Sequence, residues 1–178
     1  MSVSIGPSQV AYVSMGSNLG DRAGNLLLAV RGMLEAGLTV NRLSSVYETD
    51  AVDKFSHAVT SENPSFLNMV AELRNPLPPP EQLLARLLRI EFALGRTREV
   101  PGGPRTVDLD LLLCADHRRD TEYLTLPHPR LHLRRFVLEP LAELEPQLIH
   151  PTLHRSVSEL LTAVNDEATV TRWLPGAL

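Results

Sequence analysis

The chain has 178 residues, of which 43% are hydrophobic and 21% charged, and its formal net charge is −4. This length favours one domain over residues 1–178, and the composition is that of a globular protein rather than a disordered or fibrous one. The negative net charge argues against general binding of polyanions, so any phosphate site must be local. The sequence has no apolar run of membrane-spanning length and no signal-peptide pattern, so a cytoplasmic location is expected.

The first half of the chain alternates strand and helix patterns. We expect residues 1–9 to be a flexible extension, residues 10–15 to be a strand, and Asp21 to cap a helix that ends at Gly37. The apolar spacing predicts that this helix buries Leu26, Leu27, Val30, Met33 and Leu34. Residues 38–47 and 65–73 predict two further strands, and the aperiodic stretch 48–64 between them predicts a long loop.

The second half begins with the clearest helix, residues 81–94. Glu91 falls within its apolar stripe, which consists of Leu84, Leu87, Leu88 and Leu94. The remaining expected elements are strands at 106–113 and 123–127, helices at 131–144 and 157–164, and a closing strand at 170–173. The order β-α-β-β-α-β, followed by additional helices and a strand, predicts an α+β ferredoxin-like plait with a mostly antiparallel sheet.

Asp108 and Asp110 stand at alternate positions of the strand that continues into three leucines. Alternate side chains of a strand share a face, with backbone positions about 6.5 to 7 Å apart, so the two carboxylates can close on one cation. Where a strand leaves a core, two like charges repel each other unless a cation neutralises them. Oxygen ligands of this kind suit Mg²⁺. The alternative is an ordinary strand with one solvated face.

Three arginines, Arg96, Arg98 and Arg105, surround the Pro/Gly-rich loop before that strand. Guanidinium groups match phosphate oxygens and glycines permit close backbone approach, so a mobile basic loop beside a cation site predicts a phosphate lid. A solvated arginine loop is the alternative. Glu91 lies immediately upstream, where its side chain can reach the same site.

A second basic cluster consists of His128, Arg130, Arg134 and Arg135. The other histidines lack the neighbouring carboxylates or cysteines of a metal site, and Cys114 has no partner for a disulfide, so it is expected to pack as a small apolar residue. The turn over residues 16–20 matches neither the Walker sequence nor the dinucleotide fingerprint, which excludes the commonest ATP-binding folds.

Several motifs together resemble one enzyme family. Residues 103–112, Gly-Pro-Arg-Thr-Val-Asp-Leu-Asp-Leu-Leu, are similar to the signature of the 6-hydroxymethyl-7,8-dihydropterin pyrophosphokinases, which transfer pyrophosphate from ATP to a pterin alcohol in folate biosynthesis. The resemblance extends from about residue 10 to 165 and includes, in the family order, residues 12–20, 45–49, 66–68, 89–96 and 126–136. It implies an α+β fold with a ferredoxin-like core, as the order of elements predicts independently.

The resemblance implies a nucleotide side of the site. Asp108 and Asp110 would hold two Mg²⁺ ions that bridge the ATP phosphates, and Arg96 and Arg105 would contact those phosphates. These four are the implied catalytic residues. Further nucleotide contacts are implied for Glu91, Arg98, His128 and Leu111, of which Leu111 would lie against the adenine.

The resemblance also implies a pterin pocket. Its lining would be Thr49, Asn68, Phe66 and Phe136, with Asn68 bonded to the pterin edge, Phe136 stacked on the ring and Asn18 beside them. The chain departs from the family in two loops. Asp50-Ala-Val-Asp53 replaces the proline and glycine that usually follow Thr49, and Gly102 replaces a tryptophan of the lid.

Two other functions fit part of the sequence. Another Mg²⁺-dependent phosphoryl or nucleotidyl transferase would share the two aspartates but not Asn68 and Phe136. An RNA-binding ferredoxin-like module would use the arginine clusters, but the aromatic content of 4% and the net charge of −4 argue against it. The expected partners are therefore ATP and a reduced pterin alcohol, with no nucleic acid, membrane or obligate protein partner.

Overall fold

A computed structural model describes residues 9–50, 65–96 and 105–175. The residues described include the strands β1 (Val10–Ser17), β2 (Thr39–Leu43), β3 (Tyr47–Thr49), β4 (Phe66–Arg74), β5 (Asp108–Cys114), β6 (Arg119–Asp120), β7 (Thr125–Leu126) and β8 (Val170–Arg172). The helices are α1 (Arg22–Glu35), α2 (Pro80–Ala93), the short 3₁₀ helix η1 (Leu131–Leu133), α3 (Arg135–Leu144) and α4 (Val157–Ala163). The predicted N-terminal extension up to residue 8, the predicted loop at 51–64, and Arg98 and Gly102 lie outside the described residues.

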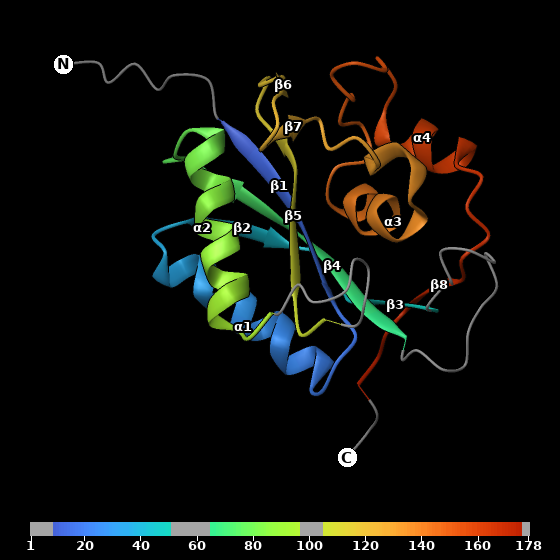
Figure 1. Ribbon diagram of the computed structural model, residues 1–178. Helices are drawn as coiled ribbons and strands as arrows, with labels where there is room; N and C mark the ends of the chain where they lie inside the picture. Colours follow the sequence, from blue (N-terminus) through green and yellow to red (C-terminus); the bar gives the residue numbers. More distant parts are fainter. Residues whose placement is uncertain (1–8, 51–64, 97–104, 176–178) are drawn as a thin grey trace.

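The main sheet is antiparallel around β1, and its order is β5-β1-β4-β3-β8, with β2 also paired to β4 (Figure 1). Strand β4 and strand β5 both run antiparallel to β1, so the end of β1 lies beside the beginnings of the other two. Two helices, α1 and α2, connect these strands in the order of the ferredoxin-like plait. The predicted α+β fold class is therefore confirmed.

The predicted strand at 38–47 is wrong as one continuous element, because it divides into β2 and β3. Both pieces pair with β4, and the division falls at Ser44. There the Ser44 hydroxyl accepts the Val70 N–H at 2.9 Å, while the Ser44 N–H donates to the Val70 carbonyl. A side chain thus takes the place of one backbone acceptor in the ladder, which interrupts the strand without breaking its attachment to β4.

Two apolar cores lie on the two faces of the sheet. Alternate residues of β1 and β4, such as Met15 and Leu67, pack with α1 and α2 on one face, which we call the α1/α2 face. The other set, including Tyr12 and Val70, packs with α3 and α4 on what we call the α3 face. Figure 1 shows the two helix pairs on opposite sides of the strands. Cys114 is buried in the first core, as predicted for a small apolar residue.

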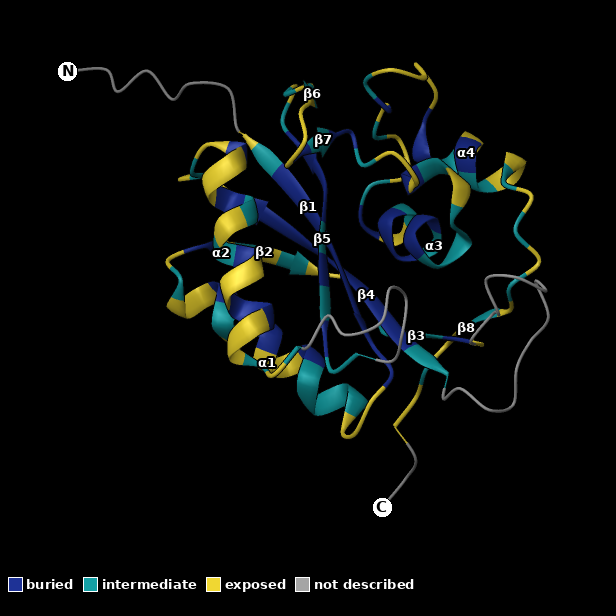
Figure 2. Cartoon of the chain, in the orientation of Figure 1, coloured by how far each residue is buried: buried dark blue, intermediate teal, exposed yellow. Residues whose placement is uncertain are grey.

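The predicted caps of the first helix agree with the structure, whereas the predicted buried stripes of the first two helices are partly wrong. The Asp21 carboxylate accepts the Gly24 N–H at 2.9 Å, and Gly37 follows the end of α1 with a positive φ. However, Leu27, Leu34 and Leu88 are exposed; the buried set is Leu26, Ala29 and Met33 on α1, and Leu83, Leu87, Ile90 and Glu91 on α2. Consecutive leucines in both helices fit two helical phases equally well, and packing selects one of them (Figure 2).

The C-terminal elements differ from the predicted ones in detail. The predicted helix at 131–144 begins as η1 and continues as α3 after Arg134. The predicted strand at 123–127 is reduced to β7, which pairs with β6 in a separate hairpin, and Tyr123 is exposed. The closing strand β8 pairs with β3 at the sheet edge. None of the helices described is both long and apolar enough to cross a membrane.

Candidate active site

The residues predicted for the nucleotide side and for the pterin side of the site come together at one glycine. Gly16 at the end of β1 pairs with Asn68 of β4 on one side and with Asp108 of β5 on the other. A Cβ atom at this position would lie 3.1 Å from Asn68 Oδ1, so the absence of a side chain permits the amide to lie over the strand. The two candidate half-sites therefore occupy adjacent strands at the same end of the sheet.

The two aspartates project on the α3 face. They alternate along β5 with Leu109 and Leu111, whose side chains are buried in the core of the α1/α2 face. The side chain of Asp108 is 20% exposed and that of Asp110 is 37% exposed. The predicted geometry of two carboxylates on one face is thus present, with both groups open to solvent.

Asp108 lies between the two arginines that the resemblance assigns to phosphates. Its Oδ1 is 2.5 Å from Arg96 Nη1, and its other oxygen accepts from Arg105 Nη1. Both guanidinium groups are more than three-quarters buried, which strengthens their electrostatic interaction with any anion that reaches this point. Arg98, the third predicted arginine, is not among the described residues.

Glu91 joins the helix α2 to this cluster. Its carboxylate is almost fully buried, accepts the Leu109 N–H at 2.7 Å and pairs with Arg96. A backbone amide and a guanidinium group compensate the cost of burying this charge. Glu91 therefore fixes Arg96 relative to β5, which explains why a glutamate interrupts an otherwise apolar helix stripe.

The other aspartate faces a second pair of basic side chains. Asp110 Oδ2 lies 4.0 Å from His128 Nε2 and 3.7 Å from Arg134 Nη1. The His128 backbone N–H donates to the Leu112 carbonyl at 2.9 Å, which holds the imidazole beside β5. Burial lowers the pKa of His128 and outweighs the nearby Asp110 carboxylate, which would raise it.

Asn18 contacts the backbone of Arg105, and its place beside the pterin stays a prediction. The resemblance puts it beside the pterin, but its Oδ1 accepts the Arg105 N–H at 2.8 Å, and its own N–H donates to the Arg105 carbonyl at 3.2 Å. The side chain is almost fully buried. Asn18 therefore attaches the backbone of Arg105 to the turn that follows β1.

The strands β3 and β4 bring together two of the residues assigned to the pterin. Asn68 Nδ2 donates to Thr49 Oγ1 at 2.7 Å, and both side chains are buried. Thr49 pairs with Phe66 in the strand register, and Phe66 shares the face of Asn68 because the two are two residues apart on β4. Thr49, Phe66 and Asn68 thus form one polar and aromatic corner on the α3 face.

Phe136 lies on the α3 face with the other candidate residues, whereas Leu111 lies on the opposite face of the sheet. Phe136 lies at the beginning of α3, partly buried against the core of the α3 face, and the Arg134 guanidinium lies over its ring at 5.4 Å from the centroid. Leu111 is buried with the core of the α1/α2 face, so a contact of its side chain with adenine stays a prediction. Sequence reasoning placed Arg134 in the second basic cluster but assigned it no contact with a substrate, although it stands two residues before Phe136.

The donor set fits a hard divalent cation. Within the described residues, no three His, Cys, Asp or Glu side chains gather as ligands. Asp108 and Asp110 by themselves offer oxygen ligands on one open face, which suits Mg²⁺ because this ion commonly takes one or two carboxylates and completes its shell with phosphate and water.

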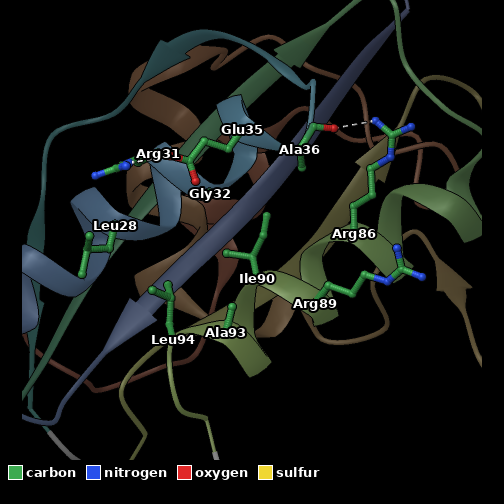
Figure 3. A pocket seen from close by; sticks show the side chains of 10 residues that line it. All are labelled: Leu28, Arg31, Gly32, Glu35, Ala36, Arg86, Arg89, Ile90, Ala93 and Leu94. Carbon is green, nitrogen blue, oxygen red and sulfur yellow. Dashed lines mark hydrogen bonds and ion pairs between the residues drawn. The ribbon is translucent and has the colours of Figure 1, made fainter.

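A groove of about 590 Å³ lies elsewhere, between α1 and α2 (Figure 3). Its floor includes Gly32, Ile90 and Ala93, and its rim carries Arg31, Arg86 and Arg89. Arg86 is committed to the Ala36 carbonyl at the end of α1, as the dashed line in Figure 3 marks. None of the ten lining residues is a predicted site residue, so this groove is separate from the candidate active site.

Comparison with known proteins places the chain in a family. The family model described as 7,8-dihydro-6-hydroxymethylpterin-pyrophosphokinase (HPPK) matches residues 12–146. The chain belongs to the HPPK family. The chain is 46% identical over 142 residues to the 2-amino-4-hydroxy-6-hydroxymethyldihydropteridine pyrophosphokinase of Bacillus subtilis, covering 79% of this chain and 81% of that one. It is 39% identical over 156 residues to the Synechocystis enzyme of the same name, covering 87% and 76%.

Solved structures agree with the fold. The chain resembles Plasmodium falciparum HPPK-DHPS with a TM-score of 0.66 and 15% identity, covering 87% of this chain and 45% of that one. The chain thus spans less than half of that solved protein. At this identity the likeness concerns the fold, and it supports the ferredoxin-like architecture.

The activity of this HPPK family member follows from its membership. It transfers pyrophosphate from ATP to 6-hydroxymethyl-7,8-dihydropterin and yields AMP and the pterin diphosphate, a step of folate biosynthesis. The resemblance drawn from the sequence is confirmed, and the two alternatives, another phosphoryl or nucleotidyl transferase and an RNA-binding module, are not supported. The roles of individual residues stay predictions.

Proposed function

We propose that the two halves of the site divide the two substrates between them. Asp108 and Asp110 would hold Mg²⁺, two ions in the complete complex, together with the phosphates of ATP. Thr49, Phe66, Asn68 and Phe136 would line the pterin pocket. The observation that supports this division is the position of Gly16, which pairs with Asp108 on one strand and with Asn68 on the next.

The nucleotide half would act mainly through charge. Arg96 and Arg105 already lie at Asp108, and the forked donors of a guanidinium group match phosphate oxygens, so both side chains would contact the phosphates held there. Glu91 and Asn18 would keep these two arginines in place, through the Arg96 side chain and the Arg105 backbone respectively. His128, Leu111 and Arg98 complete the proposed nucleotide contacts.

The pterin half would recognise an edge and a ring. The buried Asn68 amide keeps an oxygen and one N–H beyond its bond to Thr49, and these can match the donor and acceptor pattern of a pterin edge. Phe136 offers an aromatic face, and the Arg134 guanidinium over it links this ring to Asp110. An aromatic surface beside a few fixed polar groups is the usual form of a small-molecule pocket.

The proposed reaction is an in-line displacement. The pterin hydroxymethyl oxygen attacks the β-phosphorus while the bond to the α-phosphate oxygen breaks and AMP departs. Bound Mg²⁺ supplies positive charge against the phosphates during this transfer. The protein's part is to place the two substrates on adjacent strands and to hold Arg96 and Arg105 against the charge that spreads over the phosphoryl oxygens.

The organisation of the whole chain is also part of the proposal. We take residues 1–178 as one pyrophosphokinase domain, and the location as cytoplasmic. The two apolar cores share the strands β1, β4 and β5, whose neighbouring residues pack on opposite faces, and this supports a single folding unit.

The decisive experiment separates the two substrates. The protein is incubated with ATP, Mg²⁺ and 6-hydroxymethyl-7,8-dihydropterin, and the products are identified by mass spectrometry for the wild type and for variants of each half. Variants of the nucleotide half should lose AMP formation and weaken binding of a non-hydrolysable ATP analogue. Variants of the pterin half should weaken pterin binding alone; if both halves weaken both substrates equally, the proposed division is wrong.

A further inference from the structure

The first turn of α1 is attached to the ends of β3 and β4 by a compact polar cluster. Arg22 Nη1 lies 2.8 Å from Glu48 Oε1, and it also donates to the Ser65 carbonyl at 2.8 Å and to Ser65 Oγ at 2.6 Å. The Ser65 hydroxyl in turn donates to Glu48 Oε1 at 2.7 Å. Arginine, glutamate and serine thus close a three-membered ring of contacts, which we call the Arg22 cluster.

The cluster lies behind the proposed pterin pocket. Glu48 stands between Tyr47 and Thr49 on β3 and pairs with Leu67, whose side chain belongs to the α1/α2 face. Thr49 therefore points to the opposite, α3 face, where it receives the Asn68 amide. Ser65 immediately precedes Phe66. The cluster thus grips the residue next to Thr49 and the residue next to Phe66 from the far side of the sheet.

The strand that carries Thr49 is short enough to depend on this support. β3 has three residues; its pairing with β4 ends at Thr49 and Phe66, and its pairing with the equally short β8 ends at Thr49 and Val170. Strand ends fray unless side-chain contacts hold them, because few backbone bonds oppose the entropy of the chain. The Arg22 cluster ties the two strands together at that last pair.

The same turn of α1 is also tied to the nucleotide half. Asn25 Nδ2 donates to the Leu19 carbonyl at 2.9 Å and lies 3.2 Å from Ser17 Oγ. This fixes α1 to the turn containing Asn18, which holds the backbone of Arg105. The first turn of α1 therefore contacts supports of both halves, through Asn25 on one side and Arg22 on the other.

The Arg22 cluster differs from an ordinary surface ion pair on the same helix. Arg31 and Glu35 form such a pair at 2.7 Å, but their side chains are 72% and 62% exposed and neither reaches the sheet. In the Arg22 cluster the corresponding values are 26% and 34%, and three chain segments meet. The Ser65 hydroxyl and Arg22 also lower the pKa of Glu48, as expected for a carboxylate held in its charged form.

We infer that Arg22 is a positioning residue of the pterin pocket, which acts through Glu48 and Ser65 to hold Thr49 and Phe66 in register behind the bound pterin. This inference rests on the proposed function, in which Thr49, Phe66 and Asn68 contact the pterin. It assigns Arg22 no contact with either substrate. Its loss therefore affects pterin binding through the placement of Thr49 and Phe66, while the Asn25 attachment leaves the nucleotide half in place.

The test compares Arg22→Gln with Arg31→Gln, which removes an arginine from the same helix but from the exposed pair. Binding of 6-hydroxymethyl-7,8-dihydropterin and of a non-hydrolysable ATP analogue is measured by calorimetry, and KM and kcat are measured for both substrates. We expect Arg22→Gln to raise the pterin Kd and KM roughly three- to tenfold, the range expected for a coupled contact network, with the ATP-analogue Kd within about twofold. Arg31→Gln should match the wild type, and Arg22→Lys should recover part of the loss because it keeps the charge but not the forked donors.

A second variant keeps the test independent of folding. Glu48→Gln preserves the shape of β3 and the Arg22 bonds to Ser65, and it should weaken pterin binding in the same direction as Arg22→Gln. The double variant should be no worse than the poorer single variant, because both changes break one network. Melting temperatures of all variants are recorded alongside.

The outcomes separate this inference from the pocket on which it rests. If Arg22→Gln and Glu48→Gln bind pterin as tightly as Arg31→Gln does, or weaken both substrates equally, the positioning role is overturned. Asn68→Ala tests the pocket itself. If Asn68→Ala weakens pterin binding while the Arg22 cluster variants do not, the pocket stands and only the positioning role fails; if Asn68→Ala has no effect, the proposed pocket and the inference both fail.

Discussion

Two carboxylates on the α3 face, Asp108 and Glu72, each lie between two arginines, yet their surroundings differ. Glu72 of β4 accepts bonds from Arg42 and Arg74, and Asn41 donates to it at 2.6 Å. Arg42 also donates to the Leu144 carbonyl at the end of α3. The Glu72 side chain has no exposed surface, and every partner belongs to β2 or β4 or to the end of the helix above them.

Asp108 also pairs with two arginines, but in a different setting. Its arginines, Arg96 and Arg105, come from the two sides of residues 97–104 in the sequence rather than from paired strands. One fifth of its side chain is exposed, and a second carboxylate, Asp110, stands two residues away on the same face. From this comparison we predict that the cluster around Glu72 stabilises the fold, because its members sit on paired strands, whereas the cluster around Asp108 serves a ligand, because its carboxylates stay open.

The largest effect on kcat should come from removing the charge of one of the two solvent-open aspartates. Asp108→Asn or Asp110→Asn keeps the shape of the side chain but removes the charge that would hold Mg²⁺, and we expect kcat to fall by at least about a hundredfold. Turnover is measured as AMP formation at saturating Mg²⁺ and both substrates. Near-normal kcat in either variant would remove that aspartate from the catalytic machinery.

The buried carboxylate Glu72, held by Arg42 and Arg74, provides the matched control and the second prediction. Glu72→Gln also replaces a paired carboxylate by an isosteric amide, but we expect it to lower the free energy of unfolding by about 2 to 3 kcal/mol and to leave kcat close to that of the wild type. The value lies below that of a fully buried pair because Arg42 and Arg74 are 39% and 45% exposed. Urea unfolding measures it, and a Glu72→Gln protein that folds stably but has lost kcat would contradict the comparison.

The residues that begin and end helices predicted the fold more reliably than the apolar residues within them. Asp21 and Gly37 were predicted as the ends of one helix and mark its ends in the structure, because capping and positive φ depend on single residues. Some leucines of α1 and α2 that were predicted to be buried are exposed. Neighbouring leucines permit two helical phases, and only tertiary packing chooses between them. The division of the predicted strand at Ser44 could not be predicted from the sequence either, because it depends on a hydrogen bond to Val70 of another strand.

For the site, alternation along a strand was enough to place Asp108 and Asp110 on one face. Two features required the structure. Asn18 was assigned to the pterin by resemblance but contacts the backbone of Arg105, a pairing across 87 residues that no local pattern encodes. Glu72 was not noticed at all, because an isolated glutamate in a strand reads as a surface residue until its partners Arg42 and Arg74 are placed.

The third prediction compares the buried amide of Asn68 with the exposed amide of Asn41. Asn68→Ala removes the amide next to Thr49, and we expect pterin binding to weaken by about 1 to 3 kcal/mol because a polar edge of the ligand loses its partner. Phe136→Ala should weaken it by a similar or smaller amount through the loss of ring stacking. Calorimetry with a non-hydrolysable ATP analogue should show little change in either variant.

Asn41→Ala is the control for that comparison, because it removes an amide from Glu72 at the other end of the sheet. It should lower the free energy of unfolding without changing pterin affinity. If Asn68→Ala and Asn41→Ala lower pterin affinity equally, the Asn68 amide supports the sheet rather than the ligand, and the proposed pocket is wrong.

The smallest predicted effect is the pH dependence of the stability that Glu72 contributes. Burial by itself would raise the pKa of Glu72, but the bonds from Arg42, Arg74 and Asn41 outweigh it and hold the pKa below the ordinary 4.5. The carboxyl is therefore more acidic in the folded than in the unfolded protein. Its contribution to stability is present above about pH 4.5 and is lost as the pH falls through the lower, folded value.

A difference measurement separates the loss of the Glu72 contribution in acid from the effects of the other acidic groups. The pKa values of Glu48, Glu81 and Glu159 are also lowered, so the wild type alone loses stability in acid for several reasons at once. Glutamine does not titrate, so the gap in unfolding free energy between the wild type and Glu72→Gln should be constant near neutral pH and shrink below about pH 4.5. Urea unfolding at a series of pH values measures this gap. A gap that stays the same from neutral to acid pH would mean that Glu72 is stabilised as much when protonated as when charged, and the arginines would then be neighbours of the carboxylate rather than the reason for its burial.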